Sequence, residues 1–236
     1  MNTQLNSIDL NDDEFVGIEE VPAPWTLNGK GLIVVLRSKA DKLLADQRIP
    51  LDIRDTLKTP VSVLMYVDYT HSNAGPYKEL LYIPGTAQFS NKLGNKRLLT
   101  ISNIVVSSAS SVKNGRINWG IPKNLCSFDL ALGPNNTQVV SLHHEGVPQF
   151  ELAYRGKGFT FPINTGLVPG FMKTLGQRWG GKEFMYSPSA KGKARFANVH
   201  VLQNLGNAFP DLEIADVLTA LEITQFQMTF PLAEIA

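Results

Sequence analysis

The feature that most constrains the fold is a series of short segments rich in β-branched and aromatic residues, separated by turn-forming residues. Such segments favour extended strands, and the Gly, Pro, Asn and Asp residues between them favour turns. They fall at residues 32–36, 61–69, 77–84, 98–108, 127–132, 137–143, 149–154, 159–162, 193–202 and 214–230. Helical patterns are few: one at 39–47, with Ser38 as its N-cap, and one at 169–179. This pattern predicts a mainly β (α+β) fold, an antiparallel β barrel or sandwich with a few short helices.

The N-terminal segment differs in charge from the rest of the chain. Residues 1–20 contain six Asp and Glu residues and no Lys or Arg. A signal peptide needs a basic start and an apolar stretch, so this segment is not expected to be one. The strongest apolar run, at 32–36, is far too short to span a membrane. We expect an acidic arm at 1–20 and a single domain at 21–236, in a soluble, cytoplasmic protein.

The overall composition excludes several classes of function. Lys plus Arg is 22 and Asp plus Glu is 21, a net charge of +1, whereas a general nucleic-acid-binding protein carries a clear basic excess. With a single cysteine, Cys126, the chain can form no intramolecular disulfide, and we expect this thiol to be buried and inert. The four His residues form no ligand cluster, because His143 and His144 would point to opposite faces of a strand. We expect no metal, nucleic-acid or membrane partner.

The most informative stretch runs from residue 115 to 125. Lys123 is the only charged residue between Arg116 and Asp129, and apolar residues such as Trp119 and Ile121 surround it. Burial among such neighbours would lower the pKa of the amine, and a neutral amine can attack a ketone to form an imine. On composition alone, a Lys whose amine reaches solvent is the commoner arrangement. Residues 113–115, Lys-Asn-Gly, predict a turn just before this stretch.

The Lys motif resembles that of the acetoacetate decarboxylase family and its wider superfamily. The family signature is Gly-Arg, five residues, then Pro-Lys, and this chain has Gly115-Arg116 followed by Pro122-Lys123. In the family, the Lys that follows Pro forms a Schiff base with the substrate. The resemblance therefore implies the same catalytic role for Lys123.

Two further motifs resemble the family and lie upstream in the expected order. Tyr77-Lys78-Glu79 is similar to a Tyr-x-Glu motif whose Glu is the acidic residue of the active site. Trp25 and Lys30 are similar to an aromatic residue that precedes a basic one by five positions. The matches run from about residue 22 to about residue 231, so the resemblance covers nearly the whole chain and implies the family's cone-like antiparallel β barrel.

Three departures from the family pattern bear on the chemistry. Asn124 stands where the decarboxylases proper carry a second Lys, which was invoked there to lower the pKa of the first. Lys30 stands where they have Arg, so it can hold a carboxylate only as a point charge. Ile117 stands where they have Glu, which indicates a changed substrate or a different proton path.

The resemblance implies a carboxy-lyase that acts on a small oxo acid. Lys123 would attack the ketone of a β-keto acid, the iminium would accept the electrons released with carbon dioxide, and Glu79 would move protons. Lys30 or Arg116 would hold the substrate carboxylate, with Tyr77 and Trp119 also binding substrate. No metal or organic cofactor is required, and the family implies a homo-oligomer.

Two alternatives remain open at this stage. The same iminium can support aldol addition, retro-aldol cleavage or dehydration of another oxo acid, and Asn124, Ile117 and Lys30 are changes of the kind that could mark such a relative. The second alternative is a barrel that binds a small apolar or acidic ligand without turnover, in which Lys123 pairs only with Glu79 or a ligand carboxylate. The missing second Lys favours this alternative.

Overall fold

Two β-sheets form most of the protein in the computed structural model, which describes residues 15–236. The larger sheet has ten strands in the order β7 (Asn124–Leu125), β6 (Asn103–Val106), β3 (Tyr77–Ile83), β2 (Val61–His71), β1 (Trp25–Arg37), β14 (Val217–Phe230), β13 (Ser189–Asn204), β10 (Val147–Asn164), β9 (Thr137–His144) and β8 (Ser127–Gly133). The smaller sheet has five: β15 (Glu234–Ile235), β12 (Lys182–Tyr186), β11 (Leu175–Trp179), β5 (Arg97–Thr100) and β4 (Gly85–Gln88). The helices are α1 (Ala40–Ala45), α2 (Leu51–Arg54) and α3 (Ala109–Trp119).

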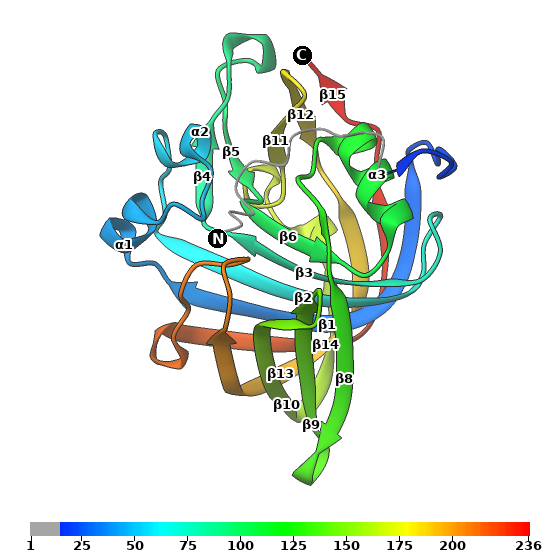
Figure 1. The fold of residues 1–236 in the computed structure, drawn as a ribbon, viewed down its shortest axis with the longest axis vertical. Helices are drawn as coiled ribbons and strands as arrows, with labels where there is room; N and C mark the ends of the chain where they lie inside the picture. Colours follow the sequence, from blue (N-terminus) through cyan, green and yellow to red (C-terminus); the bar gives the residue numbers. More distant parts are fainter. Residues whose placement is uncertain (1–14) are drawn as a thin grey trace.

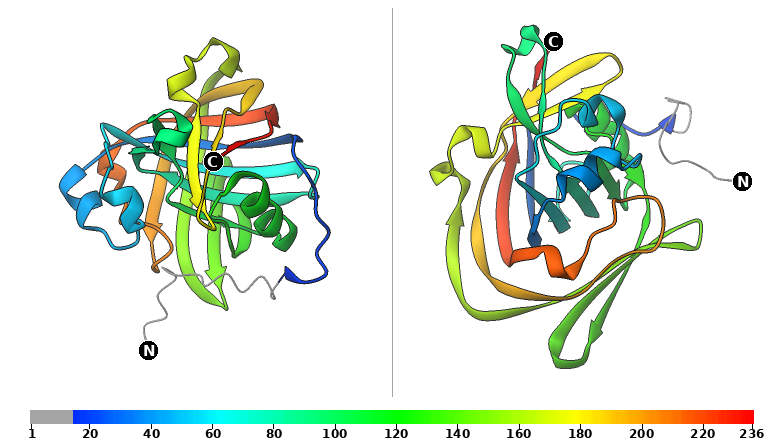
Figure 2. Two further views of the ribbon diagram at one scale, coloured as in Figure 1. Left: turned by 90° about the horizontal axis from the view of Figure 1, so that it is seen from above. Right: turned by 90° about the vertical axis from the view of Figure 1, so that its left-hand side faces the viewer.

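The large sheet curls into a nearly closed barrel. Its two outer strands, β7 and β8, are consecutive in the chain, and only Cys126 lies between them. The place where β7 and β8 meet at Cys126 is called the seam of the barrel below. There the Cys126 N–H donates to the carbonyl of Val106 at 2.9 Å, which connects the seam to β6. Strand twist brings the edges together, aided by a break in register between Lys157 and Phe161 on the long strand β10. The predicted antiparallel barrel is confirmed (Figures 1 and 2).

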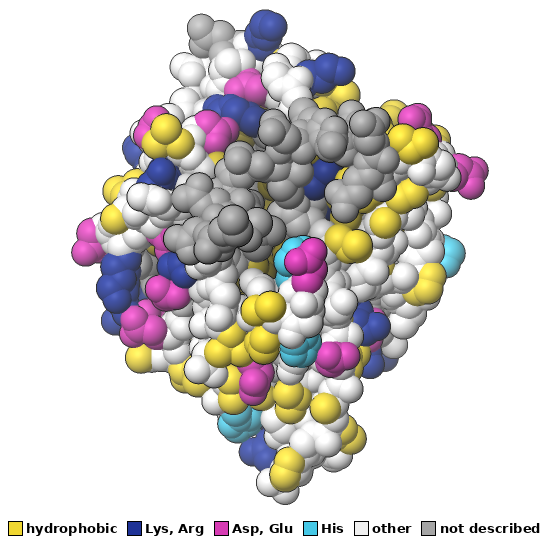
Figure 3. All heavy atoms as spheres, viewed as in Figure 1, with side chains coloured by type: hydrophobic (Ala, Val, Ile, Leu, Met, Phe, Trp, Pro, Cys, Tyr) yellow, Lys and Arg dark blue, Asp and Glu magenta, His cyan; other side chains and the backbone are white. Residues whose placement is uncertain are grey.

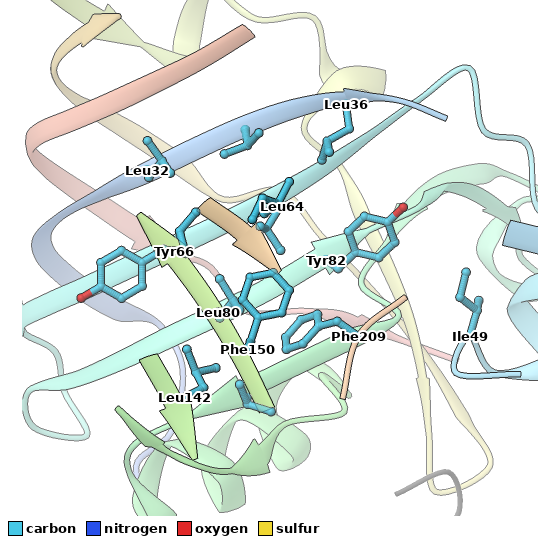
Figure 4. Packing of buried hydrophobic residues seen from close by; sticks show 14 of the residues in the cluster. Leu32, Leu36, Ile49, Leu64, Tyr66, Leu80, Tyr82, Leu142, Phe150 and Phe209 are labelled. Carbon is cyan, nitrogen blue, oxygen red and sulfur yellow. The ribbon is translucent and has the colours of Figure 1, made fainter. Parts of the chain in front are cut away.

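The barrel wall separates two hydrophobic cores because side chains alternate along each strand. On β3, Leu80 and Tyr82 point into the barrel, where they join Phe150 of β10 and Phe209 of the loop after β13 (Figure 4). Tyr77, Leu81 and Ile83 point the other way, into a second core that is covered by α3 and the small sheet and is called the outer core below. Strand β3 is therefore buried on both faces, and the outer face carries the candidate site.

Helix α3 occupies the position for which the sequence predicted a turn at 113–115. The prediction was wrong because the ends of the helix are specified outside that tripeptide. Ser108 is the N-cap, and its hydroxyl accepts a hydrogen bond from the Ser111 N–H at 3.3 Å. Gly120 ends the helix in the left-handed conformation, with φ of 63°.

Other local predictions also need correction. The predicted helix at 169–179 is a single 3₁₀ turn, Gly170–Met172, followed by β11, which pairs along its length with β12. The predicted strand at 98–108 is two strands, β5 and β6, which belong to different sheets. The predicted strands at 149–154 and 159–162 form one strand, β10. Ser38 is not the cap of α1: Lys39 holds that position without a side-chain hydrogen bond.

The acidic arm predicted at residues 1–20 lies partly outside the described residues. Its described part, residues 15–20, packs on α3: the Lys113 amine donates to the carbonyl of Ile18 at 2.6 Å, and the Asn114 amide donates to that of Glu19 at 3.0 Å. Phe15 is buried in the outer core. These residues therefore form part of the cover over α3.

The surface carries apolar side chains on the barrel wall as well as charged ones (Figure 3). Leu130 and Leu132 of β8 and Val147 of β10 are exposed. A surface of this kind suits contact with another protein, and the homo-oligomer stays a prediction. Among residues 15–236, no helix has both the length and the apolar content needed to cross a membrane.

Candidate active site

The amine of Lys123 lies in a buried polar cluster between α3 and β3. Its Nζ is 2.7 Å from Glu79 Oε2, 3.0 Å from Ser111 Oγ and 3.4 Å from the Tyr77 hydroxyl. It also lies 5.0 Å from the centre of the Tyr77 ring. Lys123 is only 4% exposed and Glu79 only 3%. The structure thus brings together three residues that the sequence proposed for one site.

The local structure explains why these side chains meet. Tyr77 and Glu79 are two residues apart on β3 and therefore project from the same face. Ser111 and Gly115 are four residues apart on α3 and share the face that looks toward β3. A Cβ at Gly115 would lie 2.7 Å from Cδ of Lys123, so the missing side chain leaves the channel in which the Lys stem runs.

Tyr69 extends the cluster to the second oxygen of Glu79. Its hydroxyl donates to Glu79 Oε1 at 3.1 Å, while Oε2 accepts from Lys123. The Tyr69 and Tyr77 rings lie 4.6 Å apart, and the edge of Phe226 packs on Tyr69. Both carboxylate oxygens of Glu79 therefore have a donor, which fixes the carboxylate beside the amine.

The charge state of Lys123 differs from the sequence prediction. Burial lowers the pKa of the amine, as predicted, but the negative charge of Glu79 and the hydrogen bonds with Glu79 and Tyr77 outweigh it, and the net pKa lies above the ordinary value. The resting pair is an ammonium and a carboxylate. The prediction of a neutral amine was wrong because Glu79 is 44 residues away in sequence and its contact could not be included.

Arg116 holds the backbone of Lys123. Its Nε and Nη2 donate to the Lys123 carbonyl at 3.0 and 2.7 Å, and Nη2 also donates to Asn124 Oδ1 at 3.1 Å. The guanidinium lies 4.7 Å from the Trp179 ring centre. Arg116 was expected to hold a substrate carboxylate, and here its guanidinium is engaged by protein acceptors next to the candidate site.

Lys30 lies on the other side of the barrel wall. It pairs in register with Asp68, which pairs with Lys78, whereas Glu79 pairs with Val67. Side chains of successive residues alternate, so Lys30 and Glu79 point to opposite faces. The Lys30 side chain is 58% exposed, and its amine lies 3.8 Å from Asp68. The structure therefore does not bring Lys30 to the Lys123 amine.

Trp119 forms part of the wall of the outer core. Its indole N–H donates to the carbonyl of Pro231 at 2.7 Å, and its ring lies edge-on 5.0 Å from Trp25. It shares this core with Tyr77. Trp119, at the C-terminal end of α3, and Trp25 therefore pack in the same core as Tyr77, and among the described residues neither is a hydrogen-bond partner of the Lys123 amine.

Sequence reasoning missed Ser111 and Tyr69. Ser111 is fully buried, four residues before Gly115, and only a helix through 113–115 would have placed it beside Lys123. Tyr69 ends the buried part of the predicted strand at 61–69, and the register that pairs it with Tyr77 could not be known from the sequence.

Other reactive groups of the described residues lie apart from this cluster. No group of three or more His, Cys, Asp and Glu side chains in residues 15–236 is arranged to hold a metal ion. Cys126 is buried, its Sγ lies 3.1 Å from the carbonyl of His143, and burial raises the pKa of the thiol to about 11. This environment suppresses the reactive thiolate.

Comparison with known proteins rests on structure alone, since no family profile and no curated protein matches the sequence. An acetoacetate decarboxylase from Legionella pneumophila subsp. pneumophila str. Philadelphia 1 superposes with a TM-score of 0.66 at 15% identity, over 95% of this chain and 94% of that one. The chain has the acetoacetate decarboxylase-like fold. An acetoacetate decarboxylase-like enzyme from Sphingomonas wittichii RW1 gives a TM-score of 0.59 at 14% identity, over 92% and 94% of the two chains.

A third neighbour with this fold was solved with a ligand. It is the enduracididine biosynthesis enzyme MppR, in complex with the condensation product of pyruvate and imidazole 4-carboxaldehyde. The TM-score is 0.60 at 13% identity, over 91% of this chain and 90% of that one. At such identities the likeness concerns the acetoacetate decarboxylase-like fold and not the reaction.

Proposed function

We propose that the protein is a lysine Schiff-base enzyme that decarboxylates a small β-keto acid, with Lys123 as the nucleophile and Glu79 as the proton carrier. The observation that carries the proposal is the buried contact of 2.7 Å between Lys123 Nζ and Glu79 Oε2. A carboxylate at hydrogen-bond distance can accept the ammonium proton and free the amine, so the site does not depend on a second Lys at position 124.

The first half of the reaction forms the iminium. Glu79 accepts a proton from the Lys123 ammonium, the free amine adds to the ketone carbon, and the carbinolamine hydroxyl leaves as water after taking the proton back from Glu79. The sum is one ammonium and one ketone giving one iminium and one water, and Glu79 ends as a carboxylate. The hydroxyls of Ser111 and Tyr77, at 3.0 and 3.4 Å from Nζ, can stabilise the carbinolamine.

The second half releases the products. The bond between the α carbon and the carboxylate breaks, carbon dioxide leaves, and the electron pair moves into the iminium to give an enamine. Protonation of the α carbon restores the iminium, and water hydrolyses it to the ketone and the Lys123 ammonium. One proton is consumed for each β-keto acid converted. The buried surroundings favour this step, because the carboxylate charge is dispersed as carbon dioxide forms.

Trapping of the imine tests the proposal. Acetoacetate and sodium borohydride should give a stable adduct on Lys123 that mass spectrometry locates, together with release of carbon dioxide when borohydride is omitted. Lys123→Ala should abolish both, and Lys123→Arg should behave alike because a guanidinium stays protonated. Lys173→Ala, a change on a Lys of the 3₁₀ turn region outside this cluster, is the control. Full turnover by Lys123→Ala would overturn the proposal.

A second candidate keeps the imine and changes the reaction. Asn124 replaces the second Lys of the decarboxylases, and one neighbour of the same fold holds a pyruvate condensation product. An iminium of pyruvate can lose an α proton to Glu79 and add to an aldehyde. Trapping at Lys123 by pyruvate, with no carbon dioxide released from acetoacetate, would favour this aldol or dehydration chemistry over decarboxylation.

A further inference from the structure

A cavity of about 400 Å³ lies beside the backbone at Lys123, and its described lining includes neither Lys123 nor Glu79. It is bounded by α2, by β6 and by the β7 segment, and Pro122 and Asn124, the residues on either side of Lys123, contribute to its wall. The Lys123 side chain leaves this backbone toward α3 and Glu79. Cavities of this size hold small organic molecules.

Arg54, at the end of α2, brings to this cavity a positive charge that no carboxylate of the described residues neutralises. Its Nε is buried and has no hydrogen-bond partner, and no Asp or Glu among residues 15–236 forms an ion pair with its guanidinium. Leaving a buried guanidinium donor unsatisfied costs folding free energy. Such a group is accounted for if an anion binds beside it.

The second guanidinium in the wall is already paired. Arg48 donates to both oxygens of Asp46, at 2.8 and 2.7 Å, and to Asp211 at 3.0 Å. No Asp or Glu is among the described residues that line the cavity. The wall therefore offers one uncompensated positive charge from its Arg residues.

The remaining wall combines amides with apolar side chains. Asn124 accepts from Arg116 through Oδ1, which leaves its amide N–H groups as donors. Leu51, Leu125 and Trp179 supply apolar surface. One positive charge, a few donors and an apolar lining suit a monoanion with a small hydrocarbon body better than a multiply charged phosphate.

We propose that this cavity is a second binding site, for a small organic monocarboxylate, with Arg54 as its charge partner. The proposal goes beyond the Schiff-base function and does not depend on it. A carboxylate bound here would lie against Asn124, whose Oδ1 shares the Arg116 guanidinium with the Lys123 carbonyl. A bound carboxylate would thus affect the position of the Lys123 backbone through Asn124 and Arg116.

Calorimetric titration of the full chain with butanoate at constant ionic strength tests the site. Butanoate has no ketone and cannot form an imine, so the result is separate from the test of Lys123. We expect one site on the wild-type protein. Arg54→Gln should weaken binding by about tenfold or more, because it removes the only unpaired guanidinium of the wall while keeping a polar side chain. Arg155→Gln on β10, outside the cavity, should bind like wild type.

Three further titrations make the proposal falsifiable. Butyramide, which is nearly isosteric but neutral, should bind at least tenfold more weakly than butanoate. Lys123→Ala should keep butanoate binding, and its loss there would place butanoate at the amine and overturn the proposal. Unchanged binding by Arg54→Gln, no binding by wild type, or tighter binding of inorganic phosphate than of butanoate would each overturn it too. Thermal unfolding of each variant confirms that it is folded.

Discussion

At the scale of single residues, the protein depends on an ion pair that is shielded from water. Separating Lys123 from Glu79 is expected to be costly, since removing one partner of a buried pair leaves an uncompensated charge and typically costs about 3–5 kcal/mol. The same pair keeps the amine protonated at rest. Under the proposed function, a resting ammonium can still give a reactive amine, because Glu79 is in direct contact with Nζ and can accept its proton.

Glu79→Gln should lower the pKa of Lys123, because it removes the charge that outweighs burial. Reductive trapping of a ketone on Lys123 should then reach its half-maximal rate at a lower pH than in wild type. Turnover should nevertheless fall by about 10²–10⁴-fold, the usual loss when a general acid–base group is removed. Rates of trapping and of carbon dioxide release, measured across pH, check both effects. Glu145→Gln, in the exposed β9–β10 turn, is the control.

The free energy of unfolding of wild type and of Glu79→Gln gives a second measure of the Lys123–Glu79 pair. Since the pKa of Lys123 is raised on folding, the pair stabilises wild type fully below the ordinary pKa of 10.5, and this contribution is lost as pH rises through the higher folded pKa. Urea unfolding should therefore show a gap between wild type and Glu79→Gln at pH 7 that narrows above pH 10.5. A trapping profile identical in the two proteins would contradict the assigned contact.

At the scale of elements, α3 forms one wall of the channel that holds the Lys123 side chain. Ser108 and Gly120 are its caps and define where it begins and ends. On its face toward β3, Ser111 offers a hydroxyl to the amine, and Gly115 leaves space for the Lys123 stem. The helix would gain stability from a better helix former at position 115 if nothing lay beneath it, by about 0.5–1 kcal/mol for Ala in place of Gly. The Lys123 stem opposes the substitution of Gly115 by Ala, because it occupies the space that the new Cβ would need.

Gly115→Ala should therefore harm activity far more than stability. The new Cβ would lie 2.7 and 2.9 Å from Cδ and Cε of Lys123, so the Lys stem must move and the contacts of Nζ with Glu79 and Ser111 are disturbed. We expect at least tenfold slower imine trapping, and a smaller fall in melting temperature than in Glu79→Gln, because the ion pair is displaced and neither partner is removed. Gly170→Ala, where nothing lies within 4 Å of the added Cβ, should leave trapping unchanged. Normal trapping by Gly115→Ala would show that the channel is not tight.

At the scale of the whole molecule, the barrel is held closed at two opposite places. On one side β1 pairs with β14, so strands from near the two ends of the chain lie together, with Trp25 opposite Phe230. On the other side β7 and β8 meet at Cys126. The long-range pairing of β1 with β14 can form only after both halves of the sheet exist, which favours slow, cooperative folding.

The thiol of Cys126 reports on the seam. Because burial raises its pKa to about 11, roughly one thiol in a thousand is ionised at pH 8, against roughly one in ten for an ordinary thiol of pKa 9.0. Alkylation by iodoacetamide at pH 8 should thus be at least about a hundredfold slower in the native protein than in 8 M urea. Cys126 is the only cysteine, so intact mass spectrometry suffices. Equal rates would mean that the seam is open in the native state.

The sequence allowed prediction of what local patterns encode. The strands β2, β3, β8 and β9 lie where predicted. The Pro-Lys and Tyr-x-Glu motifs drew attention to Lys123 and Glu79, whose side chains are in contact, and their catalytic roles stay a prediction. Helix α3 was not predicted, because Asn114 and Gly115 resemble a turn in sequence and their burial depends on partners from other segments. The raised pKa of Lys123 follows from its long-range contacts with Glu79 and Tyr77, and the placement of Lys30 on the far face follows from strand register. A local pattern contains neither.

The near-complete burial of the Lys123 amine has a kinetic consequence. A carbonyl carbon must come within bonding range of Nζ, yet only 4% of the Lys123 surface meets solvent in the present arrangement. If Lys123 is the nucleophile that we propose, admission of substrate requires a structural fluctuation that precedes bond formation. The rate of imine formation should level off at high ketone concentration at the frequency of that fluctuation, which amide hydrogen exchange along α3 can measure independently.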